Sequence, residues 1–172
     1  GHFHAALVQK TMYPDVSPIV HVFAPAGEDL DAHLNRIRDF NSRPENPTHW
    51  QEKVYSGPDF LKRMLRDKPG DLVVISGKNT HKADYIYDSL KGGLNVLADK
   101  PMAINPEQFR LLRKAFDTAA KENLLLYDIM TERFEFPTIL QRELARMPEV
   151  FGTLQSGAAT NPAVEMQSIH HF

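Results

Sequence analysis

The chain has 172 residues, of which 42% are hydrophobic and 24% charged, and its formal net charge of -2 lacks the basic excess that binding to nucleic acid requires. It contains no cysteine, which excludes disulfides, thiolate nucleophiles and cysteine-ligated metals. No apolar run approaches the roughly 20 residues needed to span a bilayer, so we expect a soluble, cytoplasmic protein with neither nucleic acid nor membrane as a partner.

Helix and strand patterns alternate along the first part of the chain. Leucine, isoleucine and phenylalanine side chains recur at spacings of three and four between residues 30 and 40, which predicts an amphipathic helix. The β-branched run at 19–23 predicts a strand. The expected order is helix 5–12, strand 19–23, helix 30–40, a proline-containing loop 41–50, strand 53–55, and a helix capped by Asp59 that reaches Leu65.

The alternation continues with stronger patterns in the second part. Residues 71–76 form a continuous apolar run between glycines, which predicts a strand buried on both faces. A helix at 81–90 is ended by Gly92 and Gly93, and strand 95–98 follows. Asn105 caps a helix with Pro106 at its first position. Its expected buried stripe is Phe109, Leu112, Ala115, Phe116 and Ala119, and the later elements are strand 124–130, helix 136–144 and a strand within 149–157.

This order of elements predicts the fold. Strands that alternate with helices form a mostly parallel, doubly wound α/β sheet through right-handed crossovers, with helices on both faces. We expect this domain to comprise residues 1–148 and residues 149–172 to begin a second one.

Ligands of such sheets bind beyond the carboxyl ends of the strands, which selects the candidate site residues. Residues 1–4, Gly1, His2, Phe3 and His4, precede a helical pattern, so their N–H groups could hold a phosphate, although a simple helix cap explains them equally well. After strand 71–76, Ser76 and Gly77 let a ligand approach the backbone, and Asn79 and His81 lie at the start of the next helix. Ordinary turn chemistry is the alternative for this segment.

Asp99, Lys100 and Pro101 end the strand at 95–98. An ammonium at this edge can donate to a hydroxyl or carbonyl oxygen and shuttle a proton, and Asp99 could bind a ribose hydroxyl or the lysine itself. The alternative is that both charges are simply solvated.

The segment "DLVVISGKNTHKADYIYDSLKGGLNVLADKPMAINPEQFRLL" resembles the core of the Gfo/Idh/MocA oxidoreductases. In that family a strand, an N-x-x-H turn, a helix ending in glycine, a short strand and an E-K-P tripeptide follow in this order. The resemblance extends from Asp71 to Phe134, and "IMTERFEFP" is similar to the family's segment after its sixth strand. The opening "GHFHAALVQK" and the "PTHW" loop resemble a subgroup of oxidoreductases whose substrates are unassigned.

The resemblance implies a Rossmann domain that binds NAD or NADP, and hydride transfer to or from a sugar, polyol or related hydroxy compound. It implies that residues 1–4 belong to the phosphate loop and that Ser76, Gly77, Asn79 and His81 line the cofactor. Asp99 takes the place of the family's glutamate. Lys100 matches the lysine that contacts the substrate hydroxyl and the nicotinamide ribose, and it is the expected catalytic residue. Self-association of the full-length protein through its second domain is also implied.

The chain departs from the family pattern in three respects. The first strand is missing, and "APAGED" replaces the acid that usually follows the second strand and holds the adenosine ribose, which leaves NAD against NADP open. The family's second-domain histidine is expected beyond Phe172, so we expect this chain alone not to turn over.

Two other functions remain as alternatives. One is a sensor or interaction module that keeps the nucleotide-binding fold without hydride chemistry. The other is a metal-dependent hydrolase, for which His2 and His4 are the only closely spaced histidine pair with alternating positions, and no acid neighbours them at ligand spacing.

Overall fold

The computed structural model describes residues 13, 15–130, 134–153, 155–158 and 160–163. It divides into two compact units, Gly1–Met130 and Thr131–Phe172. The predicted helix at 5–12 lies outside the described residues. The predicted domain boundary after residue 148 stays a prediction.

Two parallel strands form the first sheet, β1 (Ile19–Ala24) and β2 (Gln51–Ser56), with Val22 opposite Val54. They confirm the predicted strands, and β2 is longer than expected. Helix α2 (Glu28–Ser42) connects them and packs the buried Ile37 against Trp50. The spacing of three and four therefore did identify the buried face of this helix.

The loop between α2 and β2 is ordered by the side chain of Asn41. Its Oδ1 accepts hydrogen bonds from Thr48 Oγ1 at 2.6 Å and from the backbone N–H of Trp50 at 3.0 Å, while its Nδ2 donates to the Trp50 carbonyl at 2.9 Å. Thr48 is fully buried. Within the "PTHW" loop, Thr48 and Trp50 are therefore buried and bound to the end of α2, whereas Pro47 and His49 are exposed.

Helix α3 (Phe60–Asp67) follows β2, and Asp59 occupies its N-cap position. The predicted cap is wrong in one respect, because the Asp59 side chain makes no capping hydrogen bond. The helix ends at Lys68, whose left-handed φ of 36° lets its N–H donate to the Met64 carbonyl.

A histidine and a glutamate are enclosed between α2 and β2. His33 Nε2 lies 3.5 Å from Glu52 Oε1, with side chains only 16% and 15% exposed. Glu52 Oε1 accepts no hydrogen bond. Burial raises the pKa of Glu52, opposed by the nearby Arg38, and burial together with Arg36 lowers the pKa of His33. Both charged forms are therefore disfavoured by folding.

Glu52→Gln is expected to raise the free energy of unfolding by about 1 kcal/mol at about pH 7.5. Because the folded pKa of Glu52 is raised, its stabilising contribution is complete below the ordinary carboxyl pKa and is lost as the pH rises through the folded value. The gain should therefore vanish near pH 4. Urea denaturation of the full-length protein at both pH values measures it, with the exposed Glu45→Gln as the control. Equal gains at both pH values would contradict the assignment.

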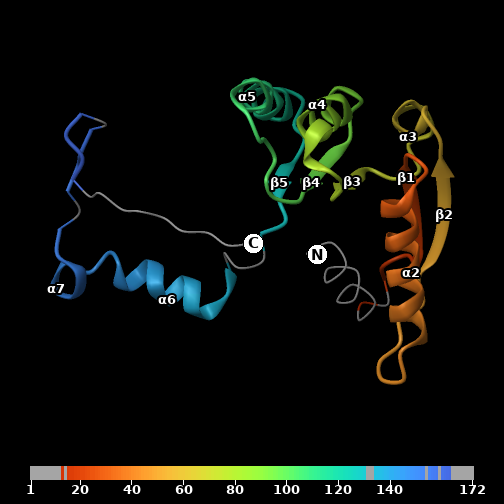
Figure 1. Cartoon of the computed structure of the whole chain (residues 1–172), viewed down its shortest axis with the longest axis horizontal. Coiled ribbons are helices and arrows are strands. Elements are labelled where there is room, and N and C mark those ends of the chain that lie inside the picture. The colour runs from red at the N-terminus through yellow and green to blue at the C-terminus, as the bar shows by residue number, and fades with distance from the viewer. Residues whose placement is uncertain (1–12, 14, 131–133, 154, 159, 164–172) are drawn as a thin grey trace. The chain divides into compact units, whose positions relative to one another are not determined.

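The second sheet contains β3 (Leu72–Ile75), β4 (Asn95–Ala98) and β5 (Leu126–Asp128), all parallel. A short 3-10 turn, η1 (Asn79–His81), leads into α4 (Lys82–Lys91), and α5 (Pro106–Lys121) joins β4 to β5. The two helices lie side by side against this sheet (Figure 1). Their shared core includes Ile86, Val96 and Ala115, each fully buried.

The predicted burial of this sheet was wrong at two places. Leu72 is 51% exposed, so β3 is not buried on both faces. In α5 the expected stripe included Phe109 and Phe116, which are 57% and 47% exposed, whereas Ala115 and Ala119 are buried as expected. Leu112 packs against the same core, so Leu112, Ala115 and Ala119 form the part of the expected stripe that the structure confirms.

Among the described strands, β1 pairs only with β2, and β3 pairs only with β4. A doubly wound sheet places its first strand at the centre, between the second and the fourth. We number β1 to β5 as the second to sixth strands of such a sheet. The pair β1–β2 then lies on one side of the central first strand, and β3–β4–β5 lies on the other. The central position is filled by no described strand.

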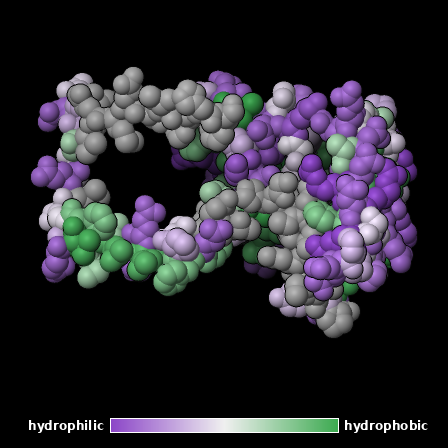
Figure 2. Space-filling view, turned by 60° about the horizontal axis from the view of Figure 1, so that its bottom comes forward, coloured by the Kyte–Doolittle hydropathy of each residue, from purple (hydrophilic) through white to green (hydrophobic). Residues whose placement is uncertain are grey.

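The second unit contains α6 (Phe136–Leu144), as predicted, and α7 (Pro148–Phe151). The predicted strand from 149 is therefore wrong at residues 149–151, where Pro148 begins a helical turn. None of the described residues of this unit is buried. Hydrophobic side chains gather along α6 and α7 (Figure 2). In the described part of the chain no helix has the length and apolarity to cross a membrane.

Candidate functional site

The carboxyl ends of β3 and β4 bring two predicted site segments together. Ile75 lies opposite Ala98 in the parallel register, and the N–H of Asp99 donates to the Ile75 carbonyl at 2.8 Å. Ser76 and Asp99 therefore begin neighbouring loops at one edge of the sheet. This is the edge at which ligands of α/β sheets bind.

The side chain of Asp99 stabilises the turn formed by Asp99 and Lys100. Asp99 Oδ1 accepts a hydrogen bond from the Lys100 N–H at 2.8 Å. Asp99 is half-buried and Lys100 is exposed, with a cis peptide bond between Lys100 and Pro101. The ammonium of Lys100 is thus free to reach a ligand at this edge, while its backbone is fixed.

Lys82, which the sequence interpretation missed, lies directly behind this turn. Its side chain is 1% exposed, and its Nζ donates to the Asp99 carbonyl at 3.0 Å. Burial lowers the pKa of Lys82, as does the charge of Lys100, whereas Asp99 opposes the shift. Lys82 therefore supports the turn that carries Asp99 and Lys100, the two expected site residues, from the buried side.

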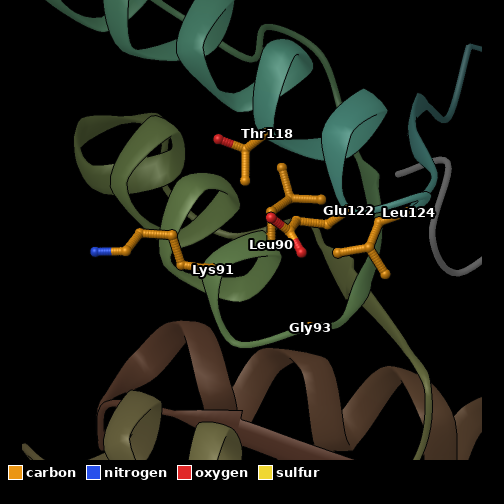
Figure 3. Close-up of a pocket in the computed structure, with 6 residues that line it drawn as sticks. All are labelled: Leu90, Lys91, Gly93, Thr118, Glu122 and Leu124. Carbon is orange, nitrogen blue, oxygen red and sulfur yellow. The ribbon is translucent and has the colours of Figure 1, made fainter.

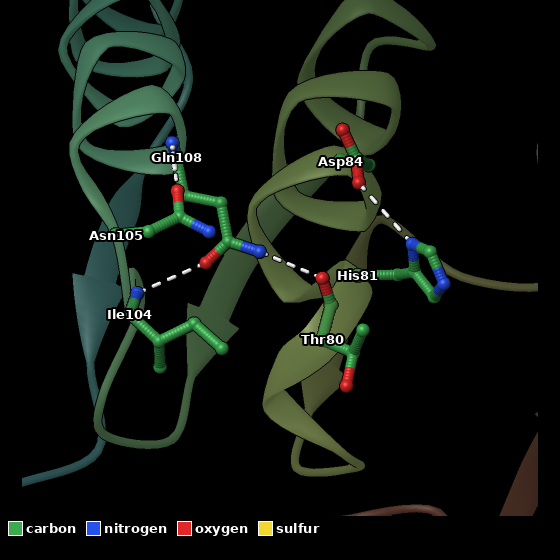
Figure 4. Close-up of polar contacts among 6 residues, drawn as sticks. All are labelled: Thr80, His81, Asp84, Ile104, Asn105 and Gln108. Carbon is green, nitrogen blue, oxygen red and sulfur yellow. Dashed lines mark hydrogen bonds and ion pairs between the residues drawn. The ribbon is translucent and has the colours of Figure 1, made fainter.

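His81 lies at the end of η1, and in this structure its side chain faces Asp84. Its side chain is 66% exposed and its Nδ1 lies 3.6 Å from Asp84 Oδ2, on the outer side of α4 (Figure 4). The position three residues after Asn79, which the N-x-x-H spacing selects, is occupied by Lys82. Counting three residues from Asn79 in the sequence would have pointed to Lys82 as the residue at this position. Cofactor contact by His81 stays a prediction.

Gln108 joins the same two loops at a second point (Figure 4). Its Nε2 donates to the Thr80 carbonyl at 2.6 Å, and its Oε1 accepts from the Ile104 N–H at 2.9 Å. The backbone N–H of Gln108 donates to Asn105 Oδ1 at 2.8 Å, which confirms the predicted cap. Gln108 is buried, and no sequence pattern singled it out.

The loop after β3 is open at its glycine. Ser76 and Gly77 are exposed, and a Cβ at Gly77 would meet no atom within 4 Å. Asn79 is half-buried and begins η1. Residues 1–4, the expected phosphate loop, lie outside the described residues. The described residues therefore leave room for a ligand at Gly77.

Acidic side chains mark the loop after β1. The first turn of α2 carries Glu28, Asp29 and Asp31, and Lys78 Nζ lies 2.9 Å from Asp29 Oδ2. Both partners of this ion pair are largely exposed. The pair links the loop after β1 to the loop after β3.

A shallow hollow lies at the opposite end of α4 and α5 (Figure 3). It is lined by Leu90, Lys91, Gly93, Thr118, Glu122 and Leu124. It is formed where α4 and α5 end, next to the amino end of β4. It is therefore separate from the loops after β3 and β4.

The parallel strands, the helices that connect them and this strand edge are those of a Rossmann-type α/β domain. Residues 3–127 match the family model described as "Oxidoreductase family, NAD-binding Rossmann fold", and residues 140–172 match "Putative oxidoreductase C terminal domain". The chain belongs to the Gfo/Idh/MocA family of oxidoreductases.

Three known proteins show how far the likeness extends. A crystal structure of a "putative oxidoreductase" from Parabacteroides merdae is 53% identical, with a TM-score of 0.82 over 95% of this chain and 37% of that one. Mouse biliverdin reductase A is 29% identical over 103 residues, 58% of this chain and 33% of its own length. The WlbA dehydrogenase of Bordetella pertussis is 15% identical, with a TM-score of 0.51 over 77% of this chain and 43% of that one. This chain thus spans less than half of each relative.

Proposed function

We propose that the full-length protein is an NAD-dependent oxidoreductase that transfers hydride to or from a sugar, polyol or related hydroxy compound. The observation that carries this proposal is the Asp99–Lys100 turn, which is fixed beside the open loop at Gly77 at the ligand-binding edge. Family membership supports the redox chemistry. The WlbA structure, in complex with NADH and UDP-GlcNAcA, supports a sugar-containing substrate.

The described residues fit a bound dinucleotide. Gly77 leaves space where a cofactor can approach the backbone. Asp99 Oδ1 is bound by the Lys100 N–H, and Asp99 Oδ2 can accept a hydrogen bond from a ribose hydroxyl. Ser76 and Asn79 add exposed or half-exposed polar groups at the same edge. The nicotinamide, when bound, accepts or donates the hydride.

Lys100 provides the proton-transfer group in this proposal. In the reduction its ammonium donates a hydrogen bond to the substrate oxygen and gives it a proton, leaving the neutral amine. In the oxidation the neutral amine takes the proton of the substrate hydroxyl and becomes the ammonium. The fixed turn at Asp99 limits the directions that the side chain can adopt. Proton transfer in this proposal therefore depends on Lys100, whose backbone N–H is held by Asp99 Oδ1.

The acids at the start of α2 favour NAD over NADP. Glu28, Asp29 and Asp31 would repel the additional phosphate of NADP, and the nearby Lys78 is already paired with Asp29. We therefore expect NADH to bind the full-length protein more tightly than NADPH, by about tenfold.

Calorimetry of the full-length protein with NADH and NADPH tests the cofactor, and turnover on a panel of sugars and polyols tests the reaction. Binding of NADH together with turnover of a panel compound supports the proposal. Binding of neither cofactor would overturn it. Cofactor binding without turnover of any panel compound would favour a sensor of the same fold.

Gly77→Ala is expected to weaken NADH binding about tenfold without changing the melting temperature. A Cβ there meets no protein atom, so any loss of affinity reports a clash with the ligand. Gly70→Ala is the matched control, because Gly70 is equally uncrowded but precedes β3 at the other end of the strand. Unchanged affinity in Gly77→Ala would exclude close approach of the cofactor to this loop.

A further inference from the structure

The contacts behind the Asp99–Lys100 turn point to a second lysine in the reaction. We propose that Lys82 is a positioning residue that orients Lys100 by holding the peptide group between Asp99 and Lys100. This inference rests on the proposed role of Lys100. In this inference Lys82 acts through its hydrogen bond to the Asp99 carbonyl and not only by filling space in the core.

One planar peptide unit is held on both of its polar atoms. Lys82 Nζ donates to its carbonyl oxygen at 3.0 Å, and Asp99 Oδ1 accepts from its N–H at 2.8 Å. Because the peptide bond is planar, fixing both atoms fixes the rotation of the whole unit. The Cα of Lys100 belongs to that unit, so the bond from Cα to Cβ can change direction only by rotation about the N–Cα bond.

Both ends of the loop that carries Lys100 are anchored. Asp99 is bound by Lys82 and, through its N–H, by the Ile75 carbonyl at 2.8 Å. At the other end the N–H of Ile104 donates to Gln108 Oε1, and Gln108 Nε2 bonds to the Thr80 carbonyl. The segment 99–104 is thus connected at two points to the residues that begin α4.

Packing alone does not account for a lysine at this position. Lys82 is 1% exposed, and transfer of an ammonium out of water costs several kcal/mol unless partners compensate for it. A methionine would fill a similar volume at no such cost. The ammonium adds what methionine lacks, a charged donor directed at the Asp99 carbonyl.

The test compares Lys82→Met with Lys82→Gln in the full-length protein. Both side chains have similar length and volume, but only glutamine can donate a hydrogen bond. Ile86→Val, a fully buried position on the same helix, controls for general loss of packing. Hydrogen exchange followed by mass spectrometry is read on peptides covering residues 99–104 and, separately, the strand β4.

Lys82→Met is expected to speed exchange in segment 99–104 about tenfold while β4 changes little. Lys82→Gln should recover part of this protection, and Ile86→Val should leave the segment unchanged. On a panel compound that is turned over, kcat should fall about thirtyfold in Lys82→Met, with the Kd of NADH altered less than about threefold. A purely structural lysine would not produce this separation of kcat from cofactor affinity.

Two results would overturn the inference. One is unchanged exchange in segment 99–104 in Lys82→Met, and the other is an equal increase in that segment and in β4. Failure of the unaltered protein to bind NADH or NADPH would instead overturn the proposed function. The exchange comparison would still decide whether Lys82 holds the turn.

Discussion

Lys100→Met in the full-length protein is expected to lower kcat about a thousandfold and to change the Kd of NADH by less than about threefold. The variant keeps most of the side-chain length but removes the group that exchanges a proton with the substrate, a contribution of about a hundredfold to ten-thousandfold in enzymes. Lys100 donates to Asp99 Oδ1 through its main-chain N–H, so this hydrogen bond remains in the variant. Steady-state turnover and calorimetry measure the two quantities.

Lys114→Met is the matched control for this experiment. Lys114 is exposed on α5, and the substitution removes the same charge away from the strand edge. It should leave kcat and cofactor affinity unchanged. Turnover in Lys100→Met within tenfold of the unaltered protein would show that another group transfers the proton.

Ile86→Ala is expected to reduce the free energy of unfolding by about 3 kcal/mol. Ile86 is fully buried in the core that β3, β4, α4 and α5 share. The substitution removes three carbon atoms and leaves a cavity, because neighbouring helices and strands cannot collapse fully around it. Urea denaturation of the full-length protein, fitted to the transition of this domain, measures the change.

Leu125→Ala provides the comparison for that loss. Leu125 is 69% exposed just before β5, so its removal should cost less than about 0.5 kcal/mol. Similar losses for the two variants would contradict this expectation. They would mean that Leu125 is covered by other residues in the full-length protein.

The sequence predicted the position of the central elements well because their signals are local. The β-branched runs located β1, β3 and β4, and the asparagine and proline before α5 located its first turn. Such patterns need no knowledge of the rest of the fold. They also placed Asp99 and Lys100 beyond the end of a strand, which the structure confirms.

Burial and side-chain contacts were less predictable. Spacing along α5 could not show which flank faces α4, and the large side chains of Phe109 and Phe116 were assigned to the wrong side. The role of Gln108 depends on residues 28 positions away in sequence, and that of Lys82 on a carbonyl 17 positions away. Contacts of this kind arise only when the strands are aligned.

One edge of β1 and one edge of β3 pair with no described strand, which has a consequence for how this domain unfolds. Contacts between the two sides of the domain include the exposed Lys78–Asp29 ion pair and the edge-to-face contact of Phe60 with Tyr85. A strand docked between β1 and β3 would hydrogen-bond to both, whereas an empty place exposes unpaired N–H and C=O groups that can recruit another chain. We therefore expect a strand that pairs with both edges to couple the unfolding of the two sides.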